Sequence, residues 1–373
     1  MTGPDRRSFL AGLAAAGLLA AARPAAALGL EAEPLRAHAE RNGLIYGASG
    51  WTRMLVEDAA NAAAFVREAG LLAPEAELKW TQIEREPGRP DYAAADGLLD
   101  WCVRHGLRMR GHHLVQGHHQ PPWVEAIRDP RRLRDAIEAH VTRTAGRYAG
   151  RLHSWDVVNE AFSVDRWNRT SEGFRKGGHF SVLGRDYLDI AFDAARRADP
   201  RTPLALNENG LEYPERRAVE KRGVVLRELR AMRRRGVPID AFGTQAHLWA
   251  RYELDAEANY RFLSEIADLG LKIYVTELDI SERGVAATDI ATRDRVVADH
   301  ARRYLDAVLR IPAVELVVTW GLSDRYSLLN SKTINKFRQR ADGLPSRGLP
   351  LDDAFRRKPM WTALAEAFEG RAA

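Results

Sequence analysis

Two segments of the chain have the pattern of buried strands, and each is followed by a glutamate. The run 152–158 precedes Asn159 and Glu160, and the run 272–276 precedes Glu277. Burying an unpaired carboxylate costs several kcal/mol, so a glutamate at such a position needs a partner or a chemical task. Two carboxylates that come from distant strand ends are what glycoside hydrolysis requires.

Other polar side chains also fall at the ends of predicted strands. They bring together carboxylates, imidazoles, amides and an indole, which is the inventory of a sugar-binding site. One strand-end glutamate alone is more often a salt-bridge partner, whereas two in these contexts favour catalysis. The further residues are Glu75, Glu77, Lys79, His112, His113, Asn207, Glu208, Gln245, His247, Asp279 and Trp320.

The elements that must position these residues alternate along the chain. Strands are predicted at 44–49, 77–80, 107–115, 152–158, 203–206, 240–247, 272–276 and 314–319. Helical periodicity is found at 57–69, 93–105, 130–148, 183–198, 214–235, 256–269, 288–309 and 359–369. Strict alternation implies a parallel sheet, and eight strands indicate a single α/β domain with the closed (β/α)8 TIM barrel fold. A doubly wound open sheet is the alternative, but the chain has no Gly-x-Gly-x-x-Gly or Walker sequence.

The first 27 residues have the pattern of a twin-arginine signal peptide. Arg6 and Arg7 precede an apolar run at 10–22, and Ala25-Ala26-Ala27 is an Ala-x-Ala cleavage pattern. The run is shorter than the roughly 20 residues that span a membrane. We therefore expect residues 28–373 to form the catalytic domain, exported in the folded state to the periplasm or the medium.

Composition argues against several other classes of function. The net charge is +5, but arginine is spread along the helices, which favours solvated helix faces over nucleic-acid binding. Cys102 is the only cysteine, so no disulfide can form within the chain, and it is predicted to be a small core residue. We expect the protein to be a monomer and its partner to be a polysaccharide. Once the signal peptide is cleaved, we expect no association with a membrane.

Several histidines raise the question of a metal site. His112, His113, His118 and His119 lie close together in sequence. Neighbours on a strand point to opposite faces, so His112 and His113 are not expected to converge, and no companion ligand pattern is present. We predict no metal and no cofactor.

The motifs that carry these residues resemble those of glycoside hydrolase family 10, the retaining endo-β-1,4-xylanases, which are (β/α)8 barrels. The matching pieces occur in the family's order along almost the whole chain after residue 27. They are Glu75-Ala76-Glu77-Leu78-Lys79-Trp80, Arg110-Gly111-His112-His113-Leu114-Val115, Trp155-Asp156-Val157-Val158-Asn159-Glu160, Gln245-Ala246-His247, Thr276-Glu277-Leu278-Asp279, and Thr319-Trp320-Gly321 with Asp324 and Lys358-Pro359.

The resemblance implies a role for each site residue. Glu160 would be the general acid/base and Glu277 the nucleophile of a double displacement, in which the two carboxyls stand about 5–5.5 Å apart. His247, linked to Asp279, would orient the nucleophile. The implied substrate-binding residues are Glu75, Lys79, His112, Asn159, Gln245 and Trp320, with Asn159 on the sugar 2-hydroxyl and Trp320 as a stacking floor.

The departures from the family pattern fall in substrate binding. Gln116 and Leu328 stand where the family usually has tryptophan, and Ala76 replaces an asparagine. The long connection 323–350 carries Arg325, Lys332, Lys336, Arg338, Arg340 and Arg347, which either are solvated or face the substrate. Three hypotheses remain: an endo-β-1,4-xylanase, the same chemistry on a bacterial and acidic exopolysaccharide, or a non-catalytic polysaccharide-binding barrel. The presence of both glutamates argues against the third.

Overall fold

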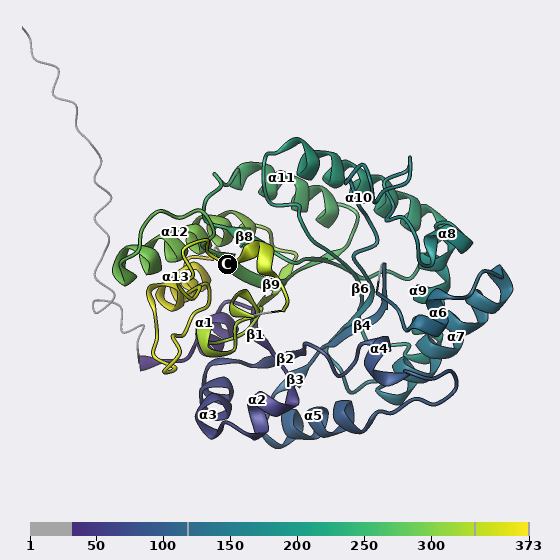
Figure 1. The fold of residues 1–373 in the computed structure, drawn as a ribbon, viewed down its shortest axis with the longest axis horizontal. Helices are drawn as coiled ribbons and strands as arrows, with labels where there is room; N and C mark the ends of the chain where they lie inside the picture. The colour runs from purple at the N-terminus through teal and green to yellow at the C-terminus, as the bar shows by residue number, and fades with distance from the viewer. Residues whose placement is uncertain (1–31, 118, 332, 372–373) are drawn as a thin grey trace, which may run out of the picture.

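A computed structural model describes residues 32–371 except 118 and 332, so the predicted signal peptide lies outside the described residues. The strands form a central ring that the longer helices surround (Figure 1). Along the ring the sheet order is β3-β2-β1-β10-β9-β7-β6-β5-β4, and all ladders are parallel. The predicted parallel barrel is confirmed.

The strands are short, and most of their residues are buried. They are β1 (Ile45–Gly50), β2 (Leu71–Pro74), β3 (Arg108–Met109), β4 (Gly111–Gln116), β5 (Trp155–Asn159), β6 (Leu204–Glu208), β7 (Ala241–Thr244), β8 (His247–Trp249), β9 (Lys272–Ser281) and β10 (Val314–Thr319). β3 and β4 are two halves of one barrel strand. Arg110 N donates to Leu72 O (3.0 Å) and Gly111 N to Ser154 O (2.7 Å), which brings the two ends of the sheet together.

Most of the longer helices lie on the outer face. They are α1 (Leu35–Arg41), α3 (Ala59–Glu68), α5 (Ala93–Arg104), α7 (Pro130–Arg147), α9 (Asp186–Ala198), α10 (Arg216–Arg235), α11 (Ala256–Ala267), α12 (Ile290–Val308) and α13 (Pro359–Glu369). Shorter helices occur at α2 (Thr52–Val56), α4 (Trp80–Ile83), α6 (Pro122–Glu125) and α8 (Phe180–Leu183). Four helices begin after an aspartate whose carboxylate accepts a backbone N–H of the first turn: Asp58, Asp129, Asp255 and Asp289.

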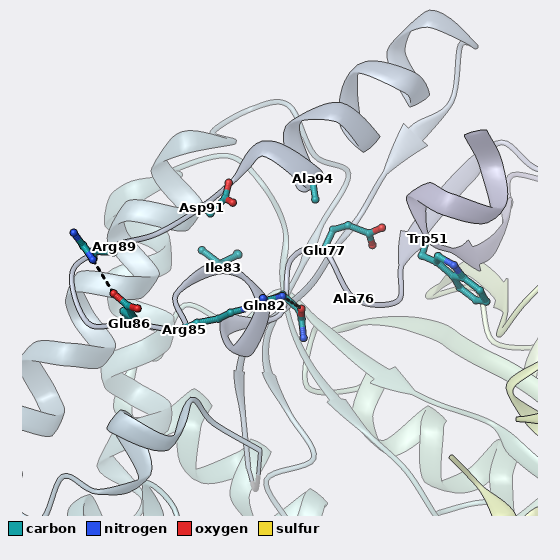
Figure 2. A pocket seen from close by; sticks show the side chains of 10 residues that line it. All are labelled: Trp51, Ala76, Glu77, Gln82, Ile83, Arg85, Glu86, Arg89, Asp91 and Ala94. Atoms are coloured by element: carbon teal, nitrogen blue, oxygen red, sulfur yellow. Dashed lines mark hydrogen bonds and ion pairs between the residues drawn. The ribbon is translucent and has the colours of Figure 1, made fainter. Parts of the chain in front are cut away.

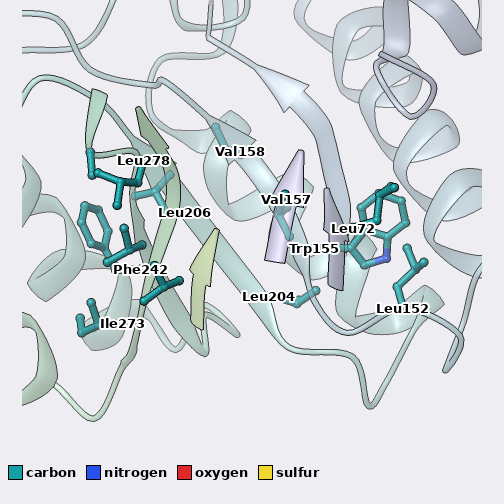
Figure 3. Close-up of a cluster of buried hydrophobic side chains, with 14 of the residues drawn as sticks. Leu72, Leu152, Trp155, Val157, Val158, Leu204, Leu206, Phe242, Ile273 and Leu278 are labelled. Carbon is teal, nitrogen blue, oxygen red and sulfur yellow. The ribbon is translucent and has the colours of Figure 1, made fainter. Parts of the chain in front are cut away.

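The core lies between the strands and the helices, and Figure 3 shows part of it around β5 and β6. Cys102 is fully buried with a free thiol, which agrees with its predicted place in the core, and Trp155 and Trp361 are fully buried as well. Gly111 in β4 leaves room for the Trp155 ring, because a Cβ at Gly111 would lie 1.9 Å from that ring. None of the helices in the described part of the chain is long and apolar enough to cross a membrane.

The second strand is the one element that the sequence placed wrongly. We predicted it at 77–80, but β2 is Leu71–Pro74 and the segment 77–80 forms a turn that enters α4. The alternation of Glu77, Leu78, Lys79 and Trp80 imitates a half-buried strand. A parallel barrel strand is buried on both faces, so the short continuous apolar run at 71–74 is the better signal.

Two other strands differ from their predicted form. The segment predicted at 240–247 is broken into β7 and β8, with Ala246 between them at a φ of 58°. β9 runs five residues beyond the predicted end, so Glu277 and Asp279 lie within it. Its register against β10 shifts, because Val317 pairs with Val275 and Thr319 with Leu278, which places one extra residue in β9 next to Glu277.

The basic connection between β10 and α13 is largely paired within the protein. Arg338 is 3% exposed and Arg340 7% exposed, and the Arg347 guanidinium binds Asp294 through two hydrogen bonds of 2.7 and 2.8 Å. These three arginines therefore match neither expectation, since they are not solvated and their guanidinium groups are bound to protein atoms. Lys332 lies outside the described residues.

Candidate active site

Glu277 is held by two side chains from other strands. Asn207 Nδ2, at the end of β6, donates to Glu277 Oε1 (2.8 Å). His247 Nε2, on β8, lies 3.3 Å from Glu277 Oε2. Glu277 is 4% exposed, so little water competes for its oxygens. Each carboxylate oxygen thus has its own donor, which fixes the rotation of the carboxylate plane.

His247 is bound on its other ring nitrogen by Asp279. Nδ1 lies 2.8 Å from Asp279 Oδ1. Burial alone would lower the pKa of His247, but the charge of Asp279 and the hydrogen bonds to Asp279 and Glu277 outweigh it and raise the pKa to about 10. Burial likewise opposes ionisation of Asp279, but Arg338 and His247 hold its pKa below the usual range. At neutral pH the imidazole is therefore a cation between two carboxylates.

Asn207 was noted as a strand-end residue but was missing from the predicted site. Its Nδ2 donates to both Glu277 Oε1 and Asn159 Oδ1 (2.9 Å), while its Oδ1 accepts the hydroxyl of Thr276 (2.7 Å). The Thr276 bond fixes which end of the amide points at Glu277. Its position directly after a predicted strand, in parallel with Asn159-Glu160, was the signal that could have found it.

Glu160 lies at the end of β5 in an unusual backbone conformation. Its φ is 55°, in the left-handed region that a non-glycine residue seldom adopts. Gly117 packs against it so closely that a Cβ there would lie 2.1 Å from Glu160 O. Gln245 Nε2 donates to Glu160 Oε1 (3.1 Å), and an Arg175 terminal nitrogen lies 3.6 Å from Oε2. Arg175 Nε also donates to Glu160 O (3.1 Å), and sequence reasoning missed this arginine.

A continuous chain of side chains joins the two glutamates. Gln245 Nε2 is shared between Glu160 Oε1 and Asn159 Oδ1 (3.2 Å), and Asn159 Oδ1 also accepts from Asn207, which reaches Glu277. Asn159 and Gln245 are 3% and 1% exposed. Strands β5, β6, β7 and β9 thus contribute to one connected group, as the sequence predicted for Glu160 and Glu277.

Glu75 and Lys79 follow β2 on the same rim. Ser49 Oγ donates to Glu75 Oε1 (2.6 Å). Burial raises the pKa of Glu75 to about 7, although the Ser49 hydrogen bond and the charge of Lys79 oppose the rise. The charge of Glu277 adds slightly to this rise.

His112 and Trp320 pack together near the site. His112 Nδ1 lies 2.9 Å from Asp156 Oδ2, whose other oxygen binds Arg110. The His112 ring meets Trp320 edge-on at 5.2 Å between centroids, and the His247 ring also does so at 6.3 Å. Trp320 is only 6% exposed, and Leu328, which stands where the family has an aromatic residue, packs against its cluster.

One expectation about the histidines is wrong. The rings of His112 and His113 lie 4.8 Å apart rather than on opposite faces, and β4 shifts its register against β5 after His112. The strict alternation on which that expectation depended is therefore not kept in this part of β4. Even so, no group of three or more histidine, cysteine or acidic residues in the described part of the chain could hold a metal ion.

A pocket of about 600 Å³ is lined in part by residues that lie between Glu75 and Lys79 in the sequence. Ala76 and Glu77 line it together with Trp51 on one side and α4 on the other, and Figure 2 shows Glu86 and Arg89 paired at its far edge. Glu77 Oε1 accepts the backbone N–H (2.6 Å) and the hydroxyl (2.8 Å) of Thr52. Ala76, with its short side chain, is one of the residues that line this open space.

Comparison with known proteins decides the family. The family model described as glycosyl hydrolase family 10 matches residues 34–367. The chain belongs to glycosyl hydrolase family 10. Endo-1,4-beta-xylanase 2 of Claviceps purpurea is 32% identical over 267 residues, which cover 72% of this chain and 74% of the relative. Endo-1,4-beta-xylanase 3 of Hypocrea jecorina is 31% identical over 289 residues, which cover 77% of this chain and 76% of the relative.

Solved structures agree with the family assignment. Native xylanase 10B from Thermotoga maritima superposes with a TM-score of 0.80 at 27% identity, over 90% of this chain and 98% of that one. Xylanase 10B from Thermotoga petrophila, solved in complex with xylobiose, has a TM-score of 0.79 at 26% identity, over 90% and 97% of the two chains. This member of family 10 is therefore a glycoside hydrolase on the barrel fold that its sequence predicted.

Proposed function

We propose that the protein is an endo-1,4-β-xylanase that works by a retaining double displacement, with Glu277 as nucleophile and Glu160 as general acid/base. The observation that carries the proposal is the hydrogen-bonded group Glu160–Gln245–Asn159–Asn207–Glu277, which joins both carboxylates at one end of the barrel. Related chains of family 10 that bear the name endo-1,4-beta-xylanase support the substrate.

The surroundings of Glu277 suit a nucleophile. Donors from Asn207 and the cationic His247 each bind one oxygen of the carboxylate and fix the direction of the attacking oxygen. Attack on the anomeric carbon forms a glycosyl ester and expels the leaving oxygen. As the ester forms, Glu277 loses its negative charge. Asn207 and His247 must therefore fix the carboxylate while leaving one lone pair of the attacking oxygen accessible to the anomeric carbon.

The surroundings of Glu160 suit a general acid/base, which donates a proton in one step and accepts one in the next. Glu160 gives its proton to the leaving oxygen, and the resulting carboxylate then takes a proton from the water that hydrolyses the ester. Its side chain is 17% exposed, so that water can reach it. Arg175 stands 3.6 Å from Oε2, where it stabilises the carboxylate that forms between the two steps.

The remaining predicted residues would bind the sugars. Asn159 lies between the two glutamates and is placed to meet the 2-hydroxyl, and Gln245 lies beside it. Glu75 and Lys79, which follow β2, and His112 on β4 would supply further polar groups. Trp320, against His112 and His247, would form the floor under the sugar that is attacked, where its ring face can stack on the pyranose.

An acidic exopolysaccharide remains the second candidate substrate, but less supports it than the sequence suggested. Arg338, Arg340 and Arg347 are engaged with Asp279, Asp342 and Asp294, so they are not free to meet uronic acids. The observation that favours a decorated chain is the open pocket beside Ala76. A non-catalytic barrel has no support from a site in which both carboxylates keep their donors.

Hydrolysis of a panel of polysaccharides, with product analysis by proton NMR, tests the proposal. We expect reducing-sugar release from xylan, with new reducing ends that first appear in the β configuration. Release only from acidic bacterial polysaccharides would favour the second candidate. An α product from xylan, or no turnover of any glycan despite binding, would contradict the assignment.

We further propose that residues 1–27 act as a twin-arginine signal and that the mature enzyme is a periplasmic or secreted monomer. Arg6-Arg7, the apolar run and Ala25-Ala26-Ala27 support this, as does a fold whose single cysteine, Cys102, needs no oxidising compartment. Replacing Arg6 and Arg7 together by lysine should leave active, full-length enzyme in the cytoplasm. Unchanged export of that double variant would contradict the route.

A further inference from the structure

Arg338 lies in the connection between β10 and α13, yet its side chain reaches the group around the nucleophile. It is 3% exposed. Its two terminal nitrogens donate to Asp279 Oδ2 (3.0 Å) and Oδ1 (2.8 Å), and one of them also donates to Leu248 O on β8 (3.0 Å). Ser281 Oγ on β9 donates to the Arg338 carbonyl (2.5 Å).

The two bonds from Arg338 decide how Asp279 faces His247. Asp279 Oδ1 is shared between Arg338 and His247 Nδ1, while Oδ2 is bound by Arg338. A bidentate guanidinium fixes the plane of a carboxylate, which a single donor does not. Arg338 also ties Asp279 on β9 to the backbone of β8, the strand that carries His247. The orientation of His247, and through it that of Glu277, thus depends on Arg338.

The loop that carries Arg338 is also held by other residues. Arg340 donates from Nε to Asp342 Oδ1 (2.9 Å) and from a terminal nitrogen to Ala287 O (3.1 Å). Arg347 binds Asp294 on α12. Further along, Ile280 N on β9 donates to Gly348 O (3.2 Å). The loop is therefore anchored at several other places, and the contact of Arg338 with Asp279 is an addition to that anchoring.

Arg338 also balances charge around the imidazole. His247 faces Asp279 and Glu277 from β9, and Arg338 is the cation that acts on it from the loop. Without Arg338, the charged partner that Asp279 keeps within the described part of the chain would be His247. The imidazolium would then be drawn toward Asp279 and away from Glu277, because opposite charges attract strongly where water is excluded.

We propose that Arg338 is a positioning residue for the nucleophile, acting through Asp279 and His247 to hold Glu277 in its attacking orientation. The proposal deepens the proposed function and depends on it. Among the described residues, the Arg338 side chain is hydrogen-bonded to Asp279 and Leu248 and to none of the residues that would bind sugar, so its loss should slow the chemical step without weakening substrate binding. A misplacement of about 1 Å at a reacting group costs up to about 10²-fold in rate.

The test compares Arg338→Gln with the matched control Arg340→Gln on an activated aryl β-xylobioside. For Arg338→Gln we expect kcat to fall by about 10- to 10²-fold, with KM within about twofold of wild type. Arg340→Gln, which loses an equally buried loop arginine without touching Asp279, should keep kcat within about twofold. Arg338→Lys should recover part of the loss, because it restores the charge but not the two-pronged contact.

A double-mutant cycle with Asp279→Asn separates positioning from a general loss of structure. If Arg338 acts through Asp279, Arg338→Gln should cost little more in the Asp279→Asn background. An equal loss of kcat in Arg338→Gln and Arg340→Gln, a change in KM alone, or full additivity in the cycle would each overturn the proposal. Failure of the proposed function is distinguishable, since wild type itself would then not hydrolyse the xylobioside.

Discussion

At the scale of single residues, the two glutamates are distinguished by what surrounds them. Glu277 is 4% exposed and is bound by Asn207 and by the imidazolium of His247, whose other ring nitrogen is bound by Asp279. Glu160 is more exposed, and its oxygens face Gln245 and Arg175. Firm fixation suits a nucleophile whose oxygen must attack along one line, whereas access to water suits a group that passes a proton in two directions.

That difference predicts an unequal response to Glu160→Ala. Substrates with poor leaving groups need protonation of the departing oxygen, so xylan hydrolysis should fall by at least about 10²-fold. Aryl xylosides with very acidic phenols leave without help, so formation of the glycosyl ester should change little. The measurement is the pre-steady-state burst of phenol for a series of aryl leaving groups. A loss that is the same for every leaving group would contradict the acid role.

The sequence predicted Glu160, Glu277, Asn159, Gln245, His247 and Asp279, and the structure places all of them in one connected group. It missed Asn207 and Arg338 for different physical reasons. Asn207 carried a signal, since it stands directly after a predicted strand, as Asn159 does, and the two residues pair in register in the structure. Arg338 carried none, because a long polar loop folds according to contacts with distant elements, here Asp279 and Leu248. Its burial could not be inferred from its neighbours in sequence.

At the scale of elements, the barrel depends on close approach at a few strand positions. Gly111 in β4 faces the ring of Trp155, and a Cβ there would lie 1.9 Å from it. Gly111→Ala should therefore destabilise the fold by at least about 1–3 kcal/mol, since neither the strand nor the buried indole can move away. The measurement is the free energy of unfolding in denaturant.

Gly97 provides the matched control for that substitution. It lies on the exposed side of α5, and a Cβ there would meet no atom within 4 Å. Gly97→Ala should be neutral or stabilise by up to about 1 kcal/mol, because alanine favours the helix. Equal effects of the two substitutions would show that the Gly111–Trp155 contact does not limit the packing.

Periodicity predicted most strands and the longer helices α3, α5, α7 and α9–α13. It predicted neither α1 nor the local details that orient the site residues. α13 has the predicted bounds, 359–369, because an apolar stripe and Pro359 at its first turn mark it clearly. The break between β7 and β8 and the extra residue in β9 come from pairing with neighbouring strands. No local pattern encodes them, yet they place Gln245, His247 and Glu277.

At the scale of the whole molecule, four buried histidines contribute to the loss of stability in acid. Burial lowers the pKa of His140 to about 3 and the pKa values of His153, His179 and His300 to about 4. Each of these histidines is preferentially neutral in the folded protein. Its contribution to folding stability is therefore fully present above the pKa of histidine in the unfolded chain, about 6.5. As pH falls from there toward about 4, the unfolded chain binds protons that the folded protein does not, and stability decreases.

His179 offers the cleanest check of this effect. Neither of its ring nitrogens has a hydrogen-bond partner within the described residues, and its ring packs against Trp80 and Tyr187. In His179→Phe the unfolding temperature should depend less on pH than in wild type. The advantage of the variant should grow between pH 6.5 and about 4. A difference between the two proteins that stays constant over this range would contradict the assignment.

The central claim is that Glu277 attacks the anomeric carbon while Glu160 serves the leaving oxygen. The most direct measurement is the stereochemistry of the product that Glu277→Ala forms from an activated aryl β-xylobioside in the presence of azide. We predict that this variant is inactive alone and that azide, entering the space of the lost carboxylate, restores turnover to give the α-glycosyl azide. A β-glycosyl azide, or substantial hydrolysis without azide, would contradict the account.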